Sequence, residues 1–593
     1  MSPTFRWTPL CAALALAAPA LLPAQGTPVT KSVPTADQGP DPRVGLGAGW
    51  MNAQSAIRNM ELVSATPRPA GWFNAQSMGD FGYANADLAF RGPYAFQGGY
   101  NGVQIWDLTD PATPRLRGAI VCPGGQGDVS VKGDLLFVSV EETRGRVDCG
   151  TSGVEAPVSA ERFRGVRIFD VSNLDAPRQV AAVQACRGSH THTLVPDARD
   201  TSVVYVYVGG TSPVRPAEEL AGCVASETDP GTSLFQIEVI RVPLAAPQDA
   251  RVVSTPRVFA NAQGNPAGLW AGGPIAAGAQ ETARTDQCHD LTAYPALGLA
   301  AGACSGNGIL LDISDPVNPK RVAEVSDPNF AYWHSATFSN DGRKVLFTDE
   351  WGGGVAPRCQ TTDKPEWGAN AIYSLENRDL RPQGYYKLPA AQTATENCVA
   401  HNGSLIPVPG RDLMVQAWYQ GGISVFDWTD PKAPKEIAFF DRGPMSATEL
   451  ALGGYWSAYW YNGQIVGSEI GRGLDVFRLT PSAALSQNEI DAAKLVTTAE
   501  FNPQLQTRVT WPAHVVVARA YLDQLARDDG LAAARRAAVE RELARAEGLQ
   551  GAARRTAFTT LAAALDRDAG SARDAAKVRM LAGAVRDLAT AAR

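Results

Sequence analysis

Charged side chains and histidines are scarce in this chain of 593 residues. Charged residues make up 19%, and there are only six histidines. The formal net charge of -7 argues against a basic surface that binds nucleic acid. Past the N-terminus no apolar run is long enough to cross a bilayer, so the mature chain is expected to have no transmembrane segment.

Several motifs are also missing: CxxC, the P-loop, GxSxG and HExxH. Their absence argues against a thiolate zinc site, a nucleotide cofactor and the hydrolases that these patterns define. The expected partner is then a small molecule or a protein, which the sequence does not identify. Glycine and proline are abundant, with 57 and 41 residues, as is typical of a turn-rich globular protein.

The N-terminus has the pattern of a secretory signal peptide. A single Arg6 precedes an apolar run over 9–22, and the small Ala24 follows as a cleavage residue. The alternative is a membrane anchor, for which the run is short. We predict a signal peptide over residues 1–24 and a secreted, periplasmic or cell-surface location.

Eight cysteines remain once Cys11 leaves with this peptide, and an even number in an exported chain predicts disulfides. Many connectivities are open to eight cysteines, so the pairing of sequence neighbours rests on locality alone. The predicted pairs are Cys122–Cys149, Cys186–Cys223, Cys288–Cys304 and Cys359–Cys398.

One phrase recurs through the middle of the chain. It consists of an apolar strand that ends in Asp, then a turn with Ser or Thr two residues later and a closing proline. The clear copies are GVQIWDLTDPATPRL (102–116), GVRIFDVSNLDAPRQ (165–179), GILLDISDPVNPKR (308–321) and GGISVFDWTDPKAPKE (421–436). Degenerate copies at 237–251 and 371–384 and a strand at 474–481 bring the series to seven.

A strand–turn–strand element leads into each phrase, so each unit has the make-up of a four-stranded blade. We predict a mainly β chain: a seven-bladed β-propeller over 80–482, with a linker or cap over 25–79. The recurring phrase resembles the LVIVD-repeat family of secreted bacterial β-propellers over about residues 80–480. That resemblance implies the propeller fold and export, and the two degenerate copies depart from its pattern.

Aligned on the first residue of the inner strand, six of the seven blades place histidine or aspartate at one register, and the seventh has Ser457 near it. Innermost strands line the channel of a propeller, so these side chains are expected to form a ring of metal ligands. The ring consists of Asp87, Asp128, His192, His289, His334 and His401. His190 is a further candidate, because residues two apart on a strand face the same way.

Metal-bound imidazoles usually donate their second N–H to an acid or a carbonyl. Asp290, Asp349 and Glu350 are the candidates for that role, with Glu396 and Glu469 as weaker ones. A four-histidine layout is similar to that of the carotenoid-cleavage oxygenases, in layout only, and favours iron or copper over zinc. The functional hypothesis is a metal-dependent oxidoreductase. The alternative is a non-catalytic interaction scaffold whose polar ring only bonds the backbone.

From residue 510 onward the composition changes to Ala, Leu and Arg with apolar residues at helical spacing. Gly530, Gly548 and Gly570 punctuate the pattern. We therefore predict an α-helical bundle of about four helices over residues 510–593.

Overall fold

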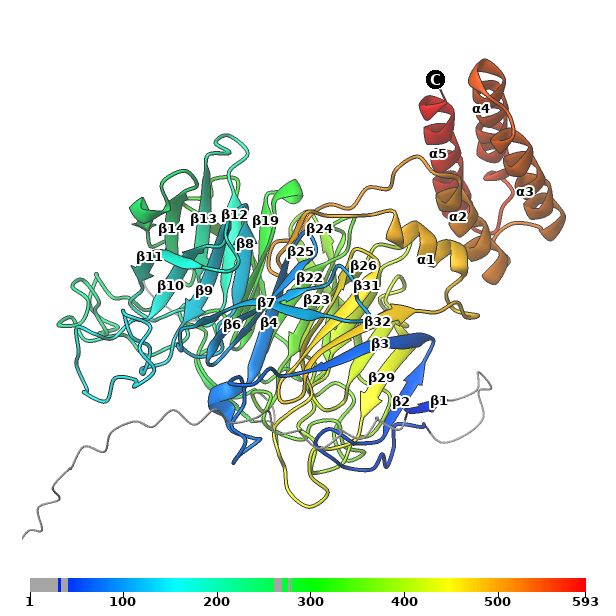
Figure 1. The fold of residues 1–593 in the computed structure, drawn as a ribbon. Coiled ribbons are helices and arrows are strands. Elements are labelled where there is room, and N and C mark those ends of the chain that lie inside the picture. The colour runs from blue at the N-terminus through cyan, green and yellow to red at the C-terminus, as the bar shows by residue number, and fades with distance from the viewer. Residues whose placement is uncertain (1–29, 33–40, 261–268, 276–277, 279, 593) are drawn as a thin grey trace, which may run out of the picture.

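The computed structural model describes residues 30–32, 41–260, 269–275, 278 and 280–592. The signal peptide predicted for 1–24 lies outside these residues. The described chain is mainly β, with small antiparallel sheets followed by helices at the C-terminal end (Figure 1).

Most sheets contain four strands that follow one another both in the chain and in the sheet. The first two are β4 (Asn85–Arg91), β5 (Tyr94–Gly99), β6 (Gly102–Asp107) and β7 (Arg115–Val121), then β8 (Val129–Lys132), β9 (Leu135–Val140), β10 (Gly165–Asp170) and β11 (Arg178–Gln184). The third is β12 (His192–Pro196), β13 (Val203–Val208), β14 (Glu238–Pro243) and β15 (Arg251–Ser254). Two more are β18 (Asp290–Tyr294), β19 (Leu299–Cys304), β20 (Asn307–Asp312) and β21 (Lys320–Val325), then β22 (Trp333–Phe338), β23 (Lys344–Asp349), β24 (Asn370–Glu376) and β25 (Asp379–Tyr386).

A ten-stranded sheet holds the last units, joined by a short parallel pairing of β26 with β30. Its strands are β26 (Asn402–Ile406), β27 (Leu413–Ala417), β28 (Ile423–Asp427), β29 (Lys435–Arg442), β30 (Tyr455–Tyr461), β31 (Gln464–Glu469) and β32 (Gly473–Leu479), with the N-terminal β1 (Thr30–Ser32), β2 (Ser55–Arg58) and β3 (Met60–Pro67) at its two ends. A separate small hairpin consists of β16 (Gly273–Pro274) and β17 (Glu281–Thr282).

The first strands of successive sheets contact one another in a closed series. Each of β4, β8, β12, β18, β22, β26 and β30 contacts the next, and β30 contacts β4 again. A closed ring of four-stranded sheets is the architecture of a β-propeller. The antiparallel pairing of β3 with β32 supplies an outer strand to the last unit, so the sheet region begins before the residue 80 that the sequence predicts.

The recurring phrase is the third strand of its sheet and the turn that follows. In each clear copy the aspartate at the strand end accepts a hydrogen bond from the backbone N–H two residues later, as at Asp107 and Thr109 (2.8 Å) and at Asp312 and Ser314 (2.9 Å). An Asp side chain that satisfies this N–H closes the turn. Each clear copy of the recurring phrase therefore forms the strand and the turn that the sequence predicts.

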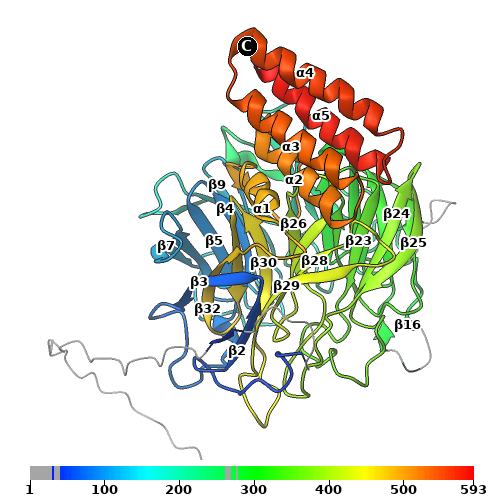
Figure 2. The ribbon, with the colours of Figure 1, turned by 90° about the vertical axis from the view of Figure 1, so that its right-hand side faces the viewer.

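Among the described residues, four helices lie within the predicted range 510–593: α2 (Val515–Arg527), α3 (Ala533–Glu547), α4 (Gly551–Asp568) and α5 (Ala575–Ala591). A further helix, α1 (Gln487–Lys494), precedes that range, and the sequence analysis does not predict it. Helices α2–α5 pack around their own apolar core and stand over one end of the sheets (Figures 1 and 2). Gln524 and Lys577 donate to the backbone carbonyls of Pro409 and Gly410, each at 2.9 Å, and so tie this bundle to the sheets.

Between α1 and α2 the chain crosses the sheets as an extended segment, residues 499–509. Its strand β33 (Glu500–Phe501) pairs with β4, and Leu505 forms a bridge with Ala293 of β18. Gln506 exchanges hydrogen bonds with the backbone of Phe338 in β22. This segment therefore links sheets that are far apart in the chain.

All four disulfides join the neighbours that the sequence predicts. Such bonds persist in oxidising compartments, so the structure agrees with an extracellular or periplasmic location. Within the described part of the chain, no helix has the length and apolar character needed to cross a membrane.

Candidate metal centre

Imidazole rings from different sheets pack side by side in a buried row at the starts of the first strands. The ring centroids of His289 and His334 lie 3.9 Å apart, and those of His334 and His401 lie 4.3 Å apart. His289 and His401 stand one residue before β18 and β26, and His334 lies in a β-bulge of β22. Outside the regular ladder, these side chains can turn toward the common row.

Glu350 joins this row directly after β23. Its carboxylate oxygens lie 3.8 Å from Nε2 of His334 and 3.5 Å from Nε2 of His401. Two ligands at about 2.1 Å from one ion lie at most about 4.2 Å apart, so these donors can share an ion. The sequence predicts Glu350 as a hydrogen-bond partner of a ligand, whereas the structure brings its carboxylate close enough to both imidazoles to be a candidate ligand itself.

The Nδ1 atoms of the three rings contact protein groups, which orients the rings. Nδ1 of His289 lies 3.0 Å from the Asp290 carboxylate, and Nδ1 of His401 bonds the Trp456 carbonyl. Nδ1 of His334 lies 3.5 Å from the Thr348 hydroxyl. Such contacts fix the tautomer of a metal-binding imidazole and favour binding through Nε2. Asp290 is therefore placed to orient the His289 ring, and its role beside a bound metal stays a prediction.

Burial decides the charge of this row. It lowers the pKa of His289 and of His334 well below the usual value, and it lowers the pKa of His401 to about 3. The neighbouring imidazoles add to the effect, since two stacked cations repel. The rings are thus neutral, the form that binds a metal. Burial also raises the pKa of Glu350 and of Asp290 to about 7.

His192, a predicted ligand, does not join the row. It is the first residue of β12, pairs with Val208 in the ladder, and is 1% exposed. Its Nδ1 lies 2.8 Å from the Ser139 hydroxyl and 3.2 Å from Asp128, and its ring packs near Phe137. Within a strand ladder the register fixes the face of the sheet on which each side chain lies, so the ring of His192 is held on the face that its register sets.

His190, the further candidate, takes the place at the end of the row. Its ring centroid lies 4.2 Å from that of His289, because it stands outside β12 in the preceding loop. Nδ1 of His190 lies 2.6 Å from the carboxylate of Glu141. Burial acts to lower the pKa of His190, but the Glu141 carboxylate outweighs it and raises this pKa to about 9. A protonated His190 is a hydrogen-bond donor and not a ligand.

Asp87 and Asp128 lie beside the row but bind other groups. Both line a narrow cavity together with His289, His334 and His401. Asp87 accepts hydrogen bonds from the backbone N–H of Leu88 and from the Tyr459 hydroxyl, each at 2.7 Å. Asp128 accepts one from the backbone N–H of His192 at 3.0 Å. Their carboxylates therefore hold the inner strands in place.

The other predicted acids stabilise loops. Asp349 accepts hydrogen bonds from the backbone N–H groups of Ala331, Tyr332 and Gly368. Glu396 bonds Thr393, and Glu469 pairs with Arg472.

Two further residues, Glu141 and Tyr419, belong to the site, and of these the sequence does not indicate Glu141. Tyr419 donates its hydroxyl proton to Glu350. Glu141 follows the second strand of its sheet, as Glu350 does. In an antiparallel hairpin the end of the second strand lies beside the start of the first. Its place directly after the second strand is therefore the feature of the sequence from which Glu141 could have been predicted.

A cavity of about 260 Å³ opens beside the row of histidines. Glu350, His190 and His289 line it together with aromatic side chains. The aromatic residues are Phe81, Tyr100, Tyr332, Tyr419 and Trp456. A concave, mostly apolar space with a few polar groups is typical of a small-molecule site. A second cavity, of about 330 Å³, lies under residues 496–509, and no histidine lines it.

No family model and no curated protein sequence matches the chain. Among solved structures, a protein from Lactobacillus plantarum is similar at 13% identity, over 65% of this chain and 88% of that one, with a TM-score of 0.38. Hydrazine synthase of Kuenenia stuttgartiensis is similar at 11% identity, over 64% and 89%, with a TM-score of 0.37. The WD40 β-propeller domain of Doa1 is similar at 9% identity, over 70% and 96%, with a TM-score of 0.38. Scores this low carry no argument about this chain.

Proposed function

We propose that this chain is an exported seven-bladed β-propeller of the LVIVD-repeat type that binds one transition-metal ion in its channel. The count of seven follows from the seven units in the sequence and is supported by the closed contacts of the first strands. The proposed ligands are Nε2 of His334, Nε2 of His401 and a carboxylate oxygen of Glu350, with His289 as the fourth.

The observation that carries this proposal is the contact of Glu350 with two buried, neutral imidazoles. Burial beside uncharged rings raises the pKa of the Glu350 carboxyl group to about 7. A bound cation would stabilise its ionised form, which is costly to bury alone, so the site favours a cation. A second group of candidate donors, His289, Asp290 and His334, shares His334 with the first. Asp290 bonds Nδ1 of His289, which suits it to orient that ring.

The expected metal is iron or copper. Imidazole with carboxylate suits divalent first-row metals, and histidine-rich sites with an open position support redox chemistry. The adjacent cavity, walled by aromatic side chains, gives a small molecule access to this place. We therefore propose a metal-dependent oxidoreductase acting on a small, largely apolar substrate.

Metal analysis of protein purified without a histidine tag tests the proposal. We expect iron or copper near one equivalent, lost in a His289→Ala/His334→Ala double variant that still folds. The matched control is His192→Gln, since His192 contacts Ser139 and Asp128 instead of the row. No metal after reconstitution with iron, copper or zinc salts contradicts the proposal and leaves the non-catalytic scaffold as the better reading.

A further inference from the structure

A buried guanidinium lies against one of the four disulfides. Arg167 in β10 is fully buried, and its Nη1 donates to the Cys122 carbonyl at 3.0 Å and contacts Sγ of Cys122. Its Nη2 donates to the Arg146 carbonyl at 2.6 Å. Among the described residues, none of the hydrogen-bond acceptors of Arg167 is a carboxylate. Burial lowers the pKa of Arg167 to about 10, although the charge of Asp148 acts to raise it.

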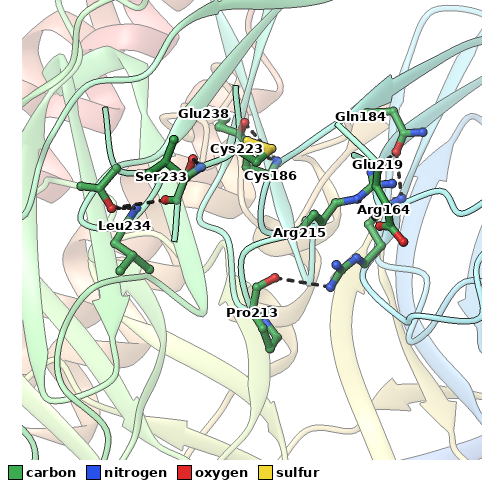
Figure 3. Close-up of a disulfide and its surroundings, with 12 residues drawn as sticks. Arg164, Gln184, Cys186, Pro213, Arg215, Glu219, Cys223, Ser233, Leu234 and Glu238 are labelled. Carbon is green, nitrogen blue, oxygen red and sulfur yellow. Dashed lines mark hydrogen bonds and ion pairs between the residues drawn. A yellow bond between two sulfur atoms is a disulfide. The ribbon is translucent and has the colours of Figure 1, made fainter. Parts of the chain in front are cut away.

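The disulfide between Cys186 and Cys223 has a carboxylate hydrogen-bonded next to it, where Cys122–Cys149 has a guanidinium. The buried carboxylate of Glu238 accepts a hydrogen bond from the Cys186 backbone N–H at 3.1 Å (Figure 3). Burial raises the pKa of Glu238 to about 7, although Arg187 and Arg215 act to lower it. Among the described residues, no cation is hydrogen-bonded to either sulfur of this disulfide, so a thiolate released there lacks a bonded cation. The sulfur atoms of the other two disulfides likewise accept no bond from a cation among the described residues, and all four of those cysteines are buried.

The two cysteines next to Arg167 also differ in access. Cys122 is buried at 5% exposure, whereas Cys149 is only half-buried. An external thiol therefore reaches the Cys149 sulfur first. Cys122 is then the leaving group, and the leaving group gains most from a nearby cation, since a stabilised thiolate departs faster.

We propose that Cys122–Cys149 is a site of thiol–disulfide exchange with an external dithiol. A thiolate of the dithiol attacks Sγ of Cys149, the bond between the two cysteines breaks, and Cys122 leaves with the electron pair as a thiolate paired with Arg167. The second thiol of the dithiol loses its proton and attacks the mixed disulfide. Cys149 leaves and takes up a proton, so the protein disulfide is reduced and the dithiol is oxidised to its own disulfide.

Limited reduction of the folded, fully oxidised chain tests this site. Dithiothreitol is added below one equivalent, free thiols are trapped with N-ethylmaleimide, and labelled peptides are counted by mass spectrometry. We expect Cys122 and Cys149 to be labelled at least about tenfold faster than the other cysteines. With glutathione as a monothiol probe, the mixed disulfide should form on Cys149. Faster labelling of another pair, or a mixed disulfide on Cys122, overturns the proposal.

The role of the guanidinium is tested by Arg167→Gln, which should slow labelling of this pair about tenfold. Arg164→Gln is the matched control, since this neighbouring buried arginine bonds the Pro213 carbonyl and no sulfur (Figure 3). Circular dichroism checks that each variant folds. An unchanged rate in folded Arg167→Gln contradicts the proposal. If that variant does not fold, Arg167→Lys, which keeps the charge, must retain most of the rate.

Discussion

The imidazole rings of His289 and His334 lie 3.9 Å apart at their centroids, although they come from different sheets. One ring stands just before β18 and the other in the bulge of β22. Two imidazoles held this close in a buried place cannot both carry a proton, because the charges repel without water to screen them. The fold thus presents uncharged nitrogen donors in a buried place.

Removing the carboxylate of Glu350 should weaken metal binding. Glu350→Gln keeps the shape of the side chain but loses its charge beside His334 and His401. We expect the metal dissociation constant, measured by competition with a chelator, to rise at least about tenfold. Glu396→Gln is the matched control, since the Glu396 carboxylate bonds Thr393. Equal losses in both variants count against Glu350 as a ligand.

The pairing of His190 with Glu141 should be visible by nuclear magnetic resonance. With six histidines in the sequence, selective ¹⁵N-histidine labelling resolves individual rings. In metal-free protein we expect His190 to titrate with a pKa of about 9. In Glu141→Gln the raising influence of the carboxylate is gone, burial dominates, and the pKa of His190 should fall below its usual 6.5.

Glu142→Gln is the control for that titration, because Glu142 is the next residue and pairs with Arg144 instead. Its His190 resonance should titrate as in the unchanged protein. A His190 pKa near 6.5 in the unchanged chain contradicts the buried pair.

The sequence predicts the strands and turns of the phrase because their causes are local. An apolar strand followed by Asp and a Ser or Thr two residues later closes its own turn, as at Asp107 and Thr109. The disulfide pairing is also local, since each bond closes a loop of neighbouring cysteines such as Cys122–Cys149. Repetition of such local signals suffices to predict the series of sheets.

The direction of each histidine could not be predicted, because it depends on where the ladder starts. His192 lies inside the ladder of β12 and faces β9, whereas His289 stands one residue outside the ladder of β18. A difference of one residue reverses the face of a side chain in a strand. The bulge at His334 adds a local change that the sequence does not display.

Glu238 should make the protein less stable as the pH rises toward neutrality. Burial raises its pKa to about 7 in the folded chain, against 4.5 when exposed. The folded state therefore holds this proton more tightly, and the stability it contributes is present below pH 4.5 and lost as the pH rises to about 7. In urea unfolding, the free energy of unfolding should fall over this range by roughly 2–3 kcal/mol more than in Glu238→Gln.

Glu218, an exposed glutamate within the loop that the Cys186–Cys223 disulfide closes, supplies the control for that measurement. Glu218→Gln should show the pH dependence of the unchanged protein. If Glu238→Gln has the same slope as well, the carboxylate titrates alike in the folded and unfolded chains.

Glu489 should hold the helical tail to the sheets. This fully buried carboxylate of α1 pairs with Arg411 from the sheets at 2.8 Å and with Arg527 of α2. Burial acts to raise its pKa, but the arginines outweigh it and lower the pKa below its usual value. Glu489→Gln leaves two partly buried cations short of their shared anion, which typically costs about 3–5 kcal/mol. We expect a loss of this order in urea unfolding followed by the helical circular-dichroism signal.

Asp491→Asn, on the exposed side of the same helix, should cost less than about 0.5 kcal/mol. A small, equal effect of both changes would mean that the tail is held by its apolar contacts, because the ion pairs would then add no net stability.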